Sequence, residues 1–386
     1  MRLFHFPLMP SLSLDLFCKV VDNFGDIGIC WRLARQLQRE HGIAVTLWVD
    51  DMRTFQRICP QVDTAVDRQL VDGVVVRHWA NQDGEFAADD VADIVIEFFG
   101  CDIPPAYIAA MAVRPHRPVW LNLEGLSAEE WVEGCHSLPS RHPRLPLTKY
   151  FFFPGFTEKT GGLLYEAGLE AERRAYIADP VAVPAFLSSL GVTAAEAAAM
   201  KVSLFCYPYA PVAEVFAAWC AGGQAVTCLV PEGVASDAVA AFLEQPAVAG
   251  AVRSEGALTV RVLPFVPQQD YDKLLWSCDL NFVRGEDSWV RAQWAAKSFI
   301  WNIYAQDENL HHKKLRAFLQ RYAAGSALDE FSLCWNGAGQ GDWAGLWKAL
   351  VTAMPEISAK SSEWQQKILA NGDLATNLTK FCASLR

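Results

Sequence analysis

Two carboxylates and two glycines are crowded into residues 20–28, which read Val-Val-Asp-Asn-Phe-Gly-Asp-Ile-Gly. This segment follows the apolar run Leu14–Val21, which is typical of a strand. It precedes Ile29–Glu40, whose apolar residues recur at helical spacing. The carboxylates therefore lie at a strand-to-helix turn. In open α/β proteins ligands bind beyond the carboxyl ends of the strands, so this turn is the first candidate site.

Asp22 and Asp26 each have an ordinary structural explanation. Asp26 comes directly before the expected helix, where a carboxylate commonly caps backbone N–H groups, and Asp22 suits a local turn. As a pair, however, they repel each other and need a cation or a helix N-terminus opposite them. Such a pair can act as a general base or hold a guanidinium by two hydrogen bonds. Both interpretations stay open at this point.

A second cluster, Arg284-Gly285-Glu286-Asp287-Ser288, follows the expected strand Leu280–Val283 and precedes a helix expected at Trp289. A helix N-terminus beside an arginine binds anions, because backbone N–H groups point outward and the guanidinium adds a full charge. A diphosphate would fit there, and Glu286 could accept hydrogen bonds from ribose hydroxyls. The alternative is an ordinary helix start, capped by Asp287 or Ser288, with an Arg–Asp surface pair.

Three weaker candidates also lie at strand ends. Phe265 and Gln268 belong to a proline-flanked turn, where an aromatic ring could stack on a base and an amide could bind its edge; core packing of Phe265 is the alternative. Tyr207 and Tyr209 end another strand and could contact a phosphate, or could be plain interfacial tyrosines. Residues 122–125 end a strand of the first half and could line an acceptor.

Bulk composition excludes several classes of protein. The formal net charge of −11 argues against a nucleic-acid binder but allows a basic protein partner. The eleven cysteines are scattered without a CxxC pair, which favours reduced thiols in the cytoplasm. The chain lacks HExxH and GxGxxG motifs, so neither a metal site nor a nicotinamide enzyme is expected. No apolar run is long enough to span a membrane.

Strands alternate with helices in both halves of the chain, which predicts parallel sheets with right-handed crossovers. We expect two Rossmann-like doubly wound domains that face each other across a cleft, the GT-B arrangement of glycosyltransferases, with helices at the C-terminal end. The expected divisions are a disordered leader at 1–12, a first domain at 13–185, a helical connector at 186–200, a second domain at 201–360 and a last helix at 361–386. That last helix could pack back on the first domain.

With residues 21–28 and 284–288 both in hand, and Leu263-Pro264-Phe265 between them, the chain resembles the EarP family. These are bacterial protein-arginine rhamnosyltransferases that modify translation elongation factor P. The resemblance extends from Leu14 to the final helix. It implies an inverting transfer of L-rhamnose from dTDP-β-L-rhamnose to one arginine of elongation factor P. It also implies no metal or other cofactor, and an acceptor that docks on the first domain in the cytoplasm.

The resemblance also assigns residues. Asp22 takes the place of the general base and Asp26 that of a second essential carboxylate, and Glu286 is counted with them as catalytic. Phe265 and Gln268 match thymine-recognition positions, and Tyr207 matches the diphosphate and ribose site. The full set expected to bind the donor is Asn23, Phe24, Gly25, Tyr207, Phe265, Gln268, Arg284, Gly285, Glu286, Asp287 and Ser288.

Two alternative functions remain open. One is a GT-B glycosyltransferase whose acceptor is a small molecule or a lipid, although the sequence shows no basic amphipathic face for a membrane. The other is a non-catalytic scaffold that binds a nucleotide, against which the intact carboxylate pair argues. Turnover of the donor would separate the scaffold from either enzyme.

Overall fold

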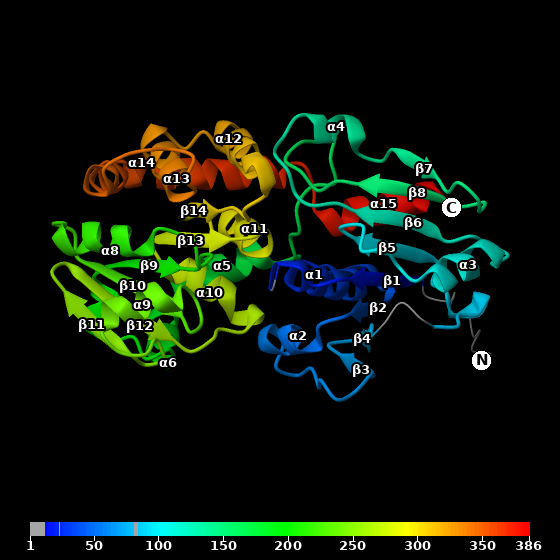
Figure 1. Ribbon diagram of the computed structural model, residues 1–386, viewed down its shortest axis with the longest axis horizontal. Coiled ribbons are helices and arrows are strands. Elements are labelled where there is room, and N and C mark those ends of the chain that lie inside the picture. The colour runs from blue at the N-terminus through cyan, green and yellow to red at the C-terminus, as the bar shows by residue number, and fades with distance from the viewer. Residues whose placement is uncertain (1–11, 23, 81–83) are drawn as a thin grey trace, which may run out of the picture. The chain divides into compact units, whose positions relative to one another are not determined.

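The structure is a computed structural model that describes residues 12–22, 24–80 and 84–386. The chain forms two compact units (Figure 1). Unit 1 comprises the residues up to 126, 130–167 and 372–386, and unit 2 comprises 127–129 and 168–371. The chain thus passes from unit 1 to unit 2 at 167–168, ahead of the boundary expected at 185, and its end returns to unit 1.

Unit 1 is built on an eight-stranded sheet with the strand order β3-β4-β2-β1-β5-β6-β8-β7. Its strands are β1 (Ser13–Cys18), β2 (Ala44–Val49), β3 (Arg68–Val71), β4 (Val74–His78), β5 (Ile94–Phe98), β6 (Val119–Leu123), β7 (Pro139–Arg141) and β8 (Thr148–Phe152). Its helices are α1 (Phe24–His41), α2 (Met52–Ile58), the 3-10 turn η1 (Ala88–Asp90), α3 (Pro105–Val113), α4 (Trp131–Cys135) and α15 (Leu374–Ser384).

The central strands of unit 1 are parallel, as expected. β1 pairs with β2 on one side and β5 on the other, and the ladder continues through β6 to β8. β1, β5 and β6 are buried almost along their whole length, which is why their sequences are largely apolar. Only the edge strands β3 and β7 run antiparallel. The carboxyl ends of β1, β5 and β6 therefore meet at one edge of the sheet, where the Asp22 turn lies.

Unit 2 contains a six-stranded sheet in the order β11-β12-β10-β9-β13-β14, parallel except for β11. Its strands are β9 (Met200–Leu204), β10 (Val226–Pro231), β11 (Val252–Glu255), β12 (Leu258–Leu263), β13 (Leu280–Arg284) and β14 (Ser298–Asn302). Its helices are α5 (Leu169–Ala178), α6 (Ala182–Ser189), α7 (Ala194–Ala198), α8 (Val212–Ala221), α9 (Ser236–Leu243), α10 (Gln268–Ser277), α11 (Asp287–Trp294), η2 (Asp307–Asn309), α12 (Leu310–Tyr322), α13 (Ser326–Trp335) and α14 (Trp343–Leu369).

The helices of unit 2 form two groups, which meet where α11 packs against α14. α8 packs against α9 and against α14, which Figure 1 shows in orange together with α13. α10 packs against α5, α6 and α11. Aromatic residues fill the core beneath the C-terminal helices; Trp289 stacks on Trp301 with ring centroids 3.6 Å apart. α10 and α11 begin at the carboxyl ends of β12 and β13, and so carry the second set of candidate residues.

Candidate active site

The β1–α1 turn differs from the expected one in a single respect: α1 begins at Phe24, so that Asp26 lies inside its first turn. The prediction that Asp26 caps the helix is therefore wrong. Its Oδ2 instead accepts hydrogen bonds from the backbone N–H groups of Val21 and Asp22, at 2.7 and 2.8 Å. Both amides precede the helix. Asp26 thus fixes the backbone that carries Asp22.

The two carboxylates differ in burial. Asp26 is only 4% exposed, and Asp22 is half-buried. Burial raises the pKa of Asp26 above its ordinary value, the two backbone hydrogen bonds oppose that rise, and the nearby charge of Asp50 adds to it. A raised pKa makes Asp26 a stronger proton acceptor than an ordinary aspartate, whereas Asp22 is the more accessible of the two.

Gly25 holds Asp22 close. Its amide donates to the Asp22 carbonyl at 2.8 Å, and a Cβ built on it would lie 3.0 Å from Asp22 Oδ2. The absence of a side chain at Gly25 therefore leaves the room that this carboxylate occupies. Phe24, beside it, has the guanidinium of Arg57 over its ring at 5.6 Å. Asn23, the remaining donor-binding candidate of this turn, lies outside the described residues.

The neighbouring strand ends in unit 1 are tied together by one amide side chain. Asn122 Oδ1, at the end of β6, accepts from the Gly100 amide at 2.8 Å, and its Nδ2 donates to Glu124 at 2.6 Å. Phe99 and Asp102 flank this contact with positive φ angles of 53° and 52°. Residues 99–102 were not among the predicted site residues, although a glycine close behind a buried strand is a signal for such a turn.

In unit 2 the loop after β13 is shaped by its own backbone. Gly285 has a φ of 58°, and its carbonyl accepts from the Trp301 indole at 2.8 Å. Ser288 does not cap α11, contrary to the expectation, and neither does Asp287: the cap position is Glu286, without a side-chain cap bond. The Ser288 hydroxyl accepts from the Arg284 amide at 3.0 Å and donates to the Arg284 carbonyl, which closes the loop on itself.

The Arg284 side chain is held between aromatic rings and a carbonyl. Its Cζ lies 4.5 Å from the ring centroid of Phe205 and 4.9 Å from that of Tyr207. Its Nη1 donates to the Cys206 carbonyl at 3.1 Å. These contacts fix a half-buried guanidinium at the N-terminus of an eight-residue helix, an arrangement suited to an anion such as a diphosphate.

The turn after β12 lies next to the loop at 284–288. Phe265 is half-buried rather than part of the core, and Gln268, at the start of α10, is buried. Gln268 Nε2 donates to Asp287 Oδ2 at 3.2 Å, which links the β12 turn to the first residue of α11. The structure therefore brings Phe205, Tyr207, Gln268 and the 284–288 loop together within unit 2, and the Asp22–Asp26 pair together within unit 1.

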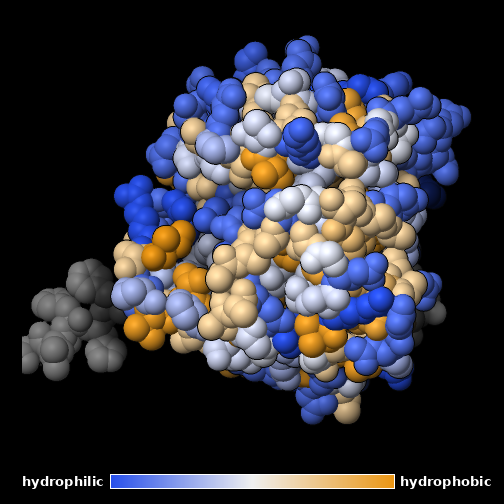
Figure 2. All heavy atoms as spheres, turned by 90° about the vertical axis from the view of Figure 1, so that its left-hand side faces the viewer, coloured by the Kyte–Doolittle hydropathy of each residue, from blue (hydrophilic) through white to orange (hydrophobic). Residues whose placement is uncertain are grey.

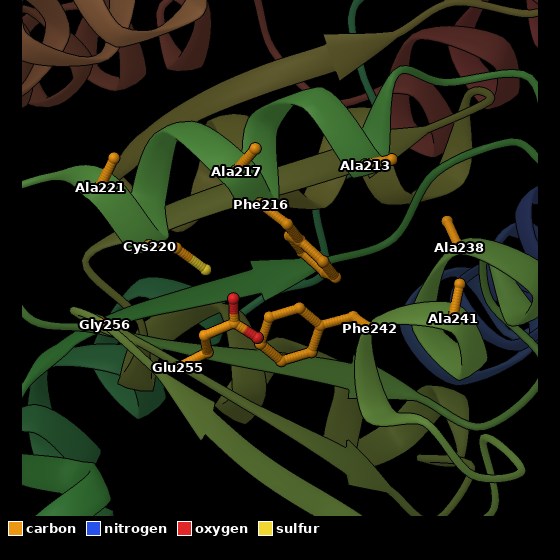
Figure 3. A pocket seen from close by; sticks show the side chains of 10 residues that line it. All are labelled: Ala213, Phe216, Ala217, Cys220, Ala221, Ala238, Ala241, Phe242, Glu255 and Gly256. Carbon is orange, nitrogen blue, oxygen red and sulfur yellow. The ribbon is translucent and has the colours of Figure 1, made fainter.

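Other parts of the described chain carry less chemistry. A cavity of about 610 Å³ lies between α8 and α9, lined mainly by alanines and by Phe216 and Phe242, with Glu255 as its one charged residue (Figure 3). It contains none of the predicted site residues. Figure 2 looks onto this side of unit 2 and shows weakly hydrophobic surface, in pale orange, across its middle.

Among the described residues, no group of three histidine, cysteine, aspartate or glutamate side chains is arranged to hold a metal ion. Within the same residues, no helix combines the length and the apolar character needed to cross a membrane.

Known proteins match the chain over almost its whole length. The family model described as the elongation factor P (EF-P) rhamnosyltransferase EarP matches residues 14–383. A protein-arginine rhamnosyltransferase of Pseudomonas putida is 48% identical over 374 residues, which cover 95% of this chain and 97% of the relative. A protein-arginine rhamnosyltransferase of Shewanella oneidensis is 39% identical, with 95% and 96% covered.

Solved structures agree with the sequence matches. The structure described as the basis for EarP-mediated arginine glycosylation of translation elongation factor EF-P matches with a TM-score of 0.68 and 34% identity, and covers 97% of this chain and 99% of that one. A spinosyn rhamnosyltransferase, at 12% identity and a TM-score of 0.53, shows the shared fold alone. The expected GT-B glycosyltransferase fold is thereby confirmed. The chain belongs to the EarP family of elongation factor P rhamnosyltransferases.

Proposed function

We propose that this protein transfers L-rhamnose from dTDP-β-L-rhamnose to an arginine side chain of elongation factor P, with inversion at the anomeric carbon and without a metal ion. The observation that carries the proposal is the Asp22–Asp26 pair, whose backbone is set by Asp26 itself. The names of the relatives support the acceptor and the sugar. Because that acceptor is a translation factor, we place the reaction in the cytoplasm.

The acceptor chemistry explains why carboxylates are needed. A free guanidinium keeps its proton at neutral pH, since its pKa is about 12.5–13.8, so an aspartate cannot remove that proton in advance. A carboxylate can orient one nitrogen and accept the proton as the new bond forms. We assign this role to Asp22, the more accessible carboxylate. Asp26 adds a second negative charge and holds the turn.

Residues of unit 2 would bind the donor and stabilise the leaving group. In one displacement the guanidinium nitrogen forms a bond to the anomeric carbon, the bond from that carbon to the phosphate oxygen breaks, and its electron pair leaves on dTDP. Arg284 and the N-terminus of α11 would stabilise the charge that develops on the leaving diphosphate. Phe265 and Gln268 would bind the thymine, and Glu286 the ribose or the sugar. One displacement leaves the product inverted.

Intact-mass measurement tests the proposal. Elongation factor P incubated with the protein and dTDP-rhamnose should gain the mass of one deoxyhexose, and a variant acceptor with the target arginine replaced by lysine should not. An unmodified wild-type acceptor would contradict the proposed function. Melting temperatures measured with dTDP, UDP and GDP test the donor separately. dTDP should raise the melting temperature because it binds the folded protein, whereas UDP and GDP should not.

The division of roles in the pair is tested by two isosteric variants. Asp22→Asn should abolish turnover and retain dTDP binding in calorimetry. Asp26→Asn keeps an oxygen that can accept the two backbone amides, so the fold should survive while turnover falls. Because burial raises the pKa of Asp26, the wild-type rate should rise with pH through a pKa above that of an ordinary aspartate. Near-normal turnover by Asp22→Asn would transfer the role of base to Asp26.

A further inference from the structure

Tyr209 is an exposed tyrosine with an unusually well-bound hydroxyl group. Its side chain is 55% exposed, yet its hydroxyl accepts from the Ala305 amide and donates to the Ile303 carbonyl, each at 3.0 Å. Holding an exposed ring in one position costs side-chain entropy, which two hydrogen bonds can offset. These bonds join the loop that follows β9 to the loop that follows β14.

The Tyr209 ring also contacts the donor-site residues. It stacks on Tyr207 with centroids 5.3 Å apart and planes 11° apart. Tyr207 in turn donates its amide to Asn302 Oδ1 at 2.8 Å, and its ring lies 4.9 Å from the guanidinium carbon of Arg284. A continuous series of contacts therefore runs from the Tyr209 hydroxyl through two rings to Arg284.

The anchor for this series is rigid. Asn302 is fully buried at the end of β14, and Asn336 Oδ1, at the end of α13, accepts from both Asn302 Nδ2 and the Ile303 amide, at 3.2 and 2.9 Å. The backbone that Tyr209 binds is thus fixed from its other side. Tyr209 then transmits this rigidity to Tyr207, whose ring also packs edge-on against Tyr304 of the same loop, with centroids 5.6 Å apart.

We propose that Tyr209 is a positioning residue: it holds the Tyr207 ring against Arg284, and thereby fixes the guanidinium for the diphosphate of the donor. The proposal rests on the donor site of the proposed function. It places Tyr209 outside direct contact with the donor, so its effect should reach the diphosphate through Tyr207 and Arg284. Recognition of the thymine base, which we assign to Phe265 and Gln268, should not depend on Tyr209.

Binding of two ligands separates positioning from general loosening. dTDP carries the diphosphate, whereas thymidine lacks it. Tyr209→Phe keeps the ring stack but loses both hydrogen bonds, and should weaken dTDP binding roughly fivefold. Tyr209→Ala loses the ring stack as well as the hydrogen bonds, and should weaken dTDP binding roughly twentyfold. Thymidine affinity, measured by ligand-observed NMR, should stay within about twofold in both variants.

Tyr176→Phe is the matched control. It removes another tyrosine hydroxyl of unit 2, one that shares a hydrogen bond with Ser277 at 2.9 Å and whose ring contacts Phe186 and Trp276 instead of Tyr207 or Tyr209. Its dTDP affinity should equal that of the wild type. Equal loss of dTDP and thymidine binding in Tyr209→Phe, or unchanged dTDP binding, would overturn the proposal.

Hydrogen exchange provides a readout that does not depend on the donor. In Tyr209→Phe the amides of Ala305 and Tyr207 should exchange faster than in the wild type. The Ala305 amide loses the hydroxyl that accepts its hydrogen bond, and Tyr207 loses a neighbouring ring that is fixed in position. Unchanged exchange in both would also overturn the role of Tyr209. Should the wild-type chain fail to bind dTDP, the donor assignment fails, and the exchange of the Tyr207 amide decides the role of Tyr209 on its own.

Discussion

Asp22 and Asp26 are four residues apart in sequence, yet their surroundings give them different tasks. Asp26 is buried and binds the amides of Val21 and Asp22, so the shape of the turn depends on it. Asp22 is more accessible and is placed by that backbone. A variant that removes the Asp26 side chain would therefore confound loss of charge with loss of geometry, and the asparagine variant avoids this.

Gly25→Ala should lower turnover without lowering stability. The new Cβ would lie 3.0 Å from Asp22 Oδ2, so the carboxylate must move away. Alanine inside a helix is otherwise favourable by about 0.5–1 kcal/mol. We expect an unchanged or higher melting temperature with at least a tenfold lower kcat. Gly134→Ala in α4 is the control, since its Cβ would contact nothing within 4 Å; equal kcat in the two variants would contradict the prediction.

Glu170→Gln should remove a pH-dependent part of the stability. Burial alone would raise the pKa of Glu170, but hydrogen bonds from Arg173, Gln365 and Arg174 outweigh it and lower the pKa to about 2. Because the folded pKa lies below the ordinary value of 4.5, this contribution is present above pH 4.5 and is lost as the pH falls towards 2. It amounts to at most about 3 kcal/mol.

The measurement is urea unfolding at pH 7 and pH 3. The wild type should lose more stability than Glu170→Gln between these two pH values. Glu172→Gln, an exposed glutamate on the same helix, should behave like the wild type. A wild-type pH dependence retained in Glu170→Gln would disprove the assignment.

At the scale of elements, a buried ion pair joins α10 and α11, the two helices that begin at the proposed donor site. Arg291 of α11 binds Asp272 of α10 through two hydrogen bonds, of 2.8 and 2.7 Å. The Arg291 side chain is 1% exposed and that of Asp272 11%. Because the loop at 284–288 leads into α11 and α10 begins with Gln268, this pair sets the spacing between the residues that we assign to the diphosphate and to the base.

Arg291→Met should destabilise unit 2 by about 3 kcal/mol, because it leaves a buried carboxylate without its partner. The double variant Arg291→Met with Asp272→Leu should recover most of that loss, since no charge then remains buried. Lys273→Met on α10 removes an ion pair that is one-third exposed and should cost less than 1 kcal/mol. Chemical unfolding measures all three, and a double variant as unstable as the single one would contradict the argument.

Buried strands were easier to predict from the sequence than exposed ones. The buried strands β1 and β13, expected at Leu14–Val21 and Leu280–Val283, were found close to those bounds, because strands covered on both faces are largely apolar runs. The antiparallel edge strands β3, β7 and β11 were missed: they are short and largely exposed, and carry arginine, serine and glutamate. At the candidate site, the sequence likewise predicted only part of the structure. Residue types and their positions after strands indicated both turns. The hydrogen bonds from Val21 and Asp22 to Asp26 could not be predicted, because they depend on the residue at which α1 begins.

At the scale of the whole molecule, the chain closes unit 1 with its own end. Leu163 forms a β-bridge with Asp373, and the amide of Leu374 donates to the Leu163 carbonyl at 2.9 Å. Gly162, with a φ of 77°, lets this crossing occur, because a side chain there would collide with the Gly372 carbonyl. α15 then packs on α1, which begins with the Asp22–Asp26 turn, and Phe381 contacts Phe152 of β8.

Leu378→Ala should therefore weaken unit 1 although it lies eight residues from the C-terminal end. Leu378 is fully buried in α15, and truncation of such a leucine costs about 3 kcal/mol through lost contacts and the cavity left behind. Calorimetry should show a lower transition for unit 1, and dTDP, which we place on unit 2, should not restore it. Leu385→Ala, at 36% exposure, is the control and should leave the transition within about 1 °C. Equal melting of the two variants would show that α15 is an appendage rather than a part of unit 1.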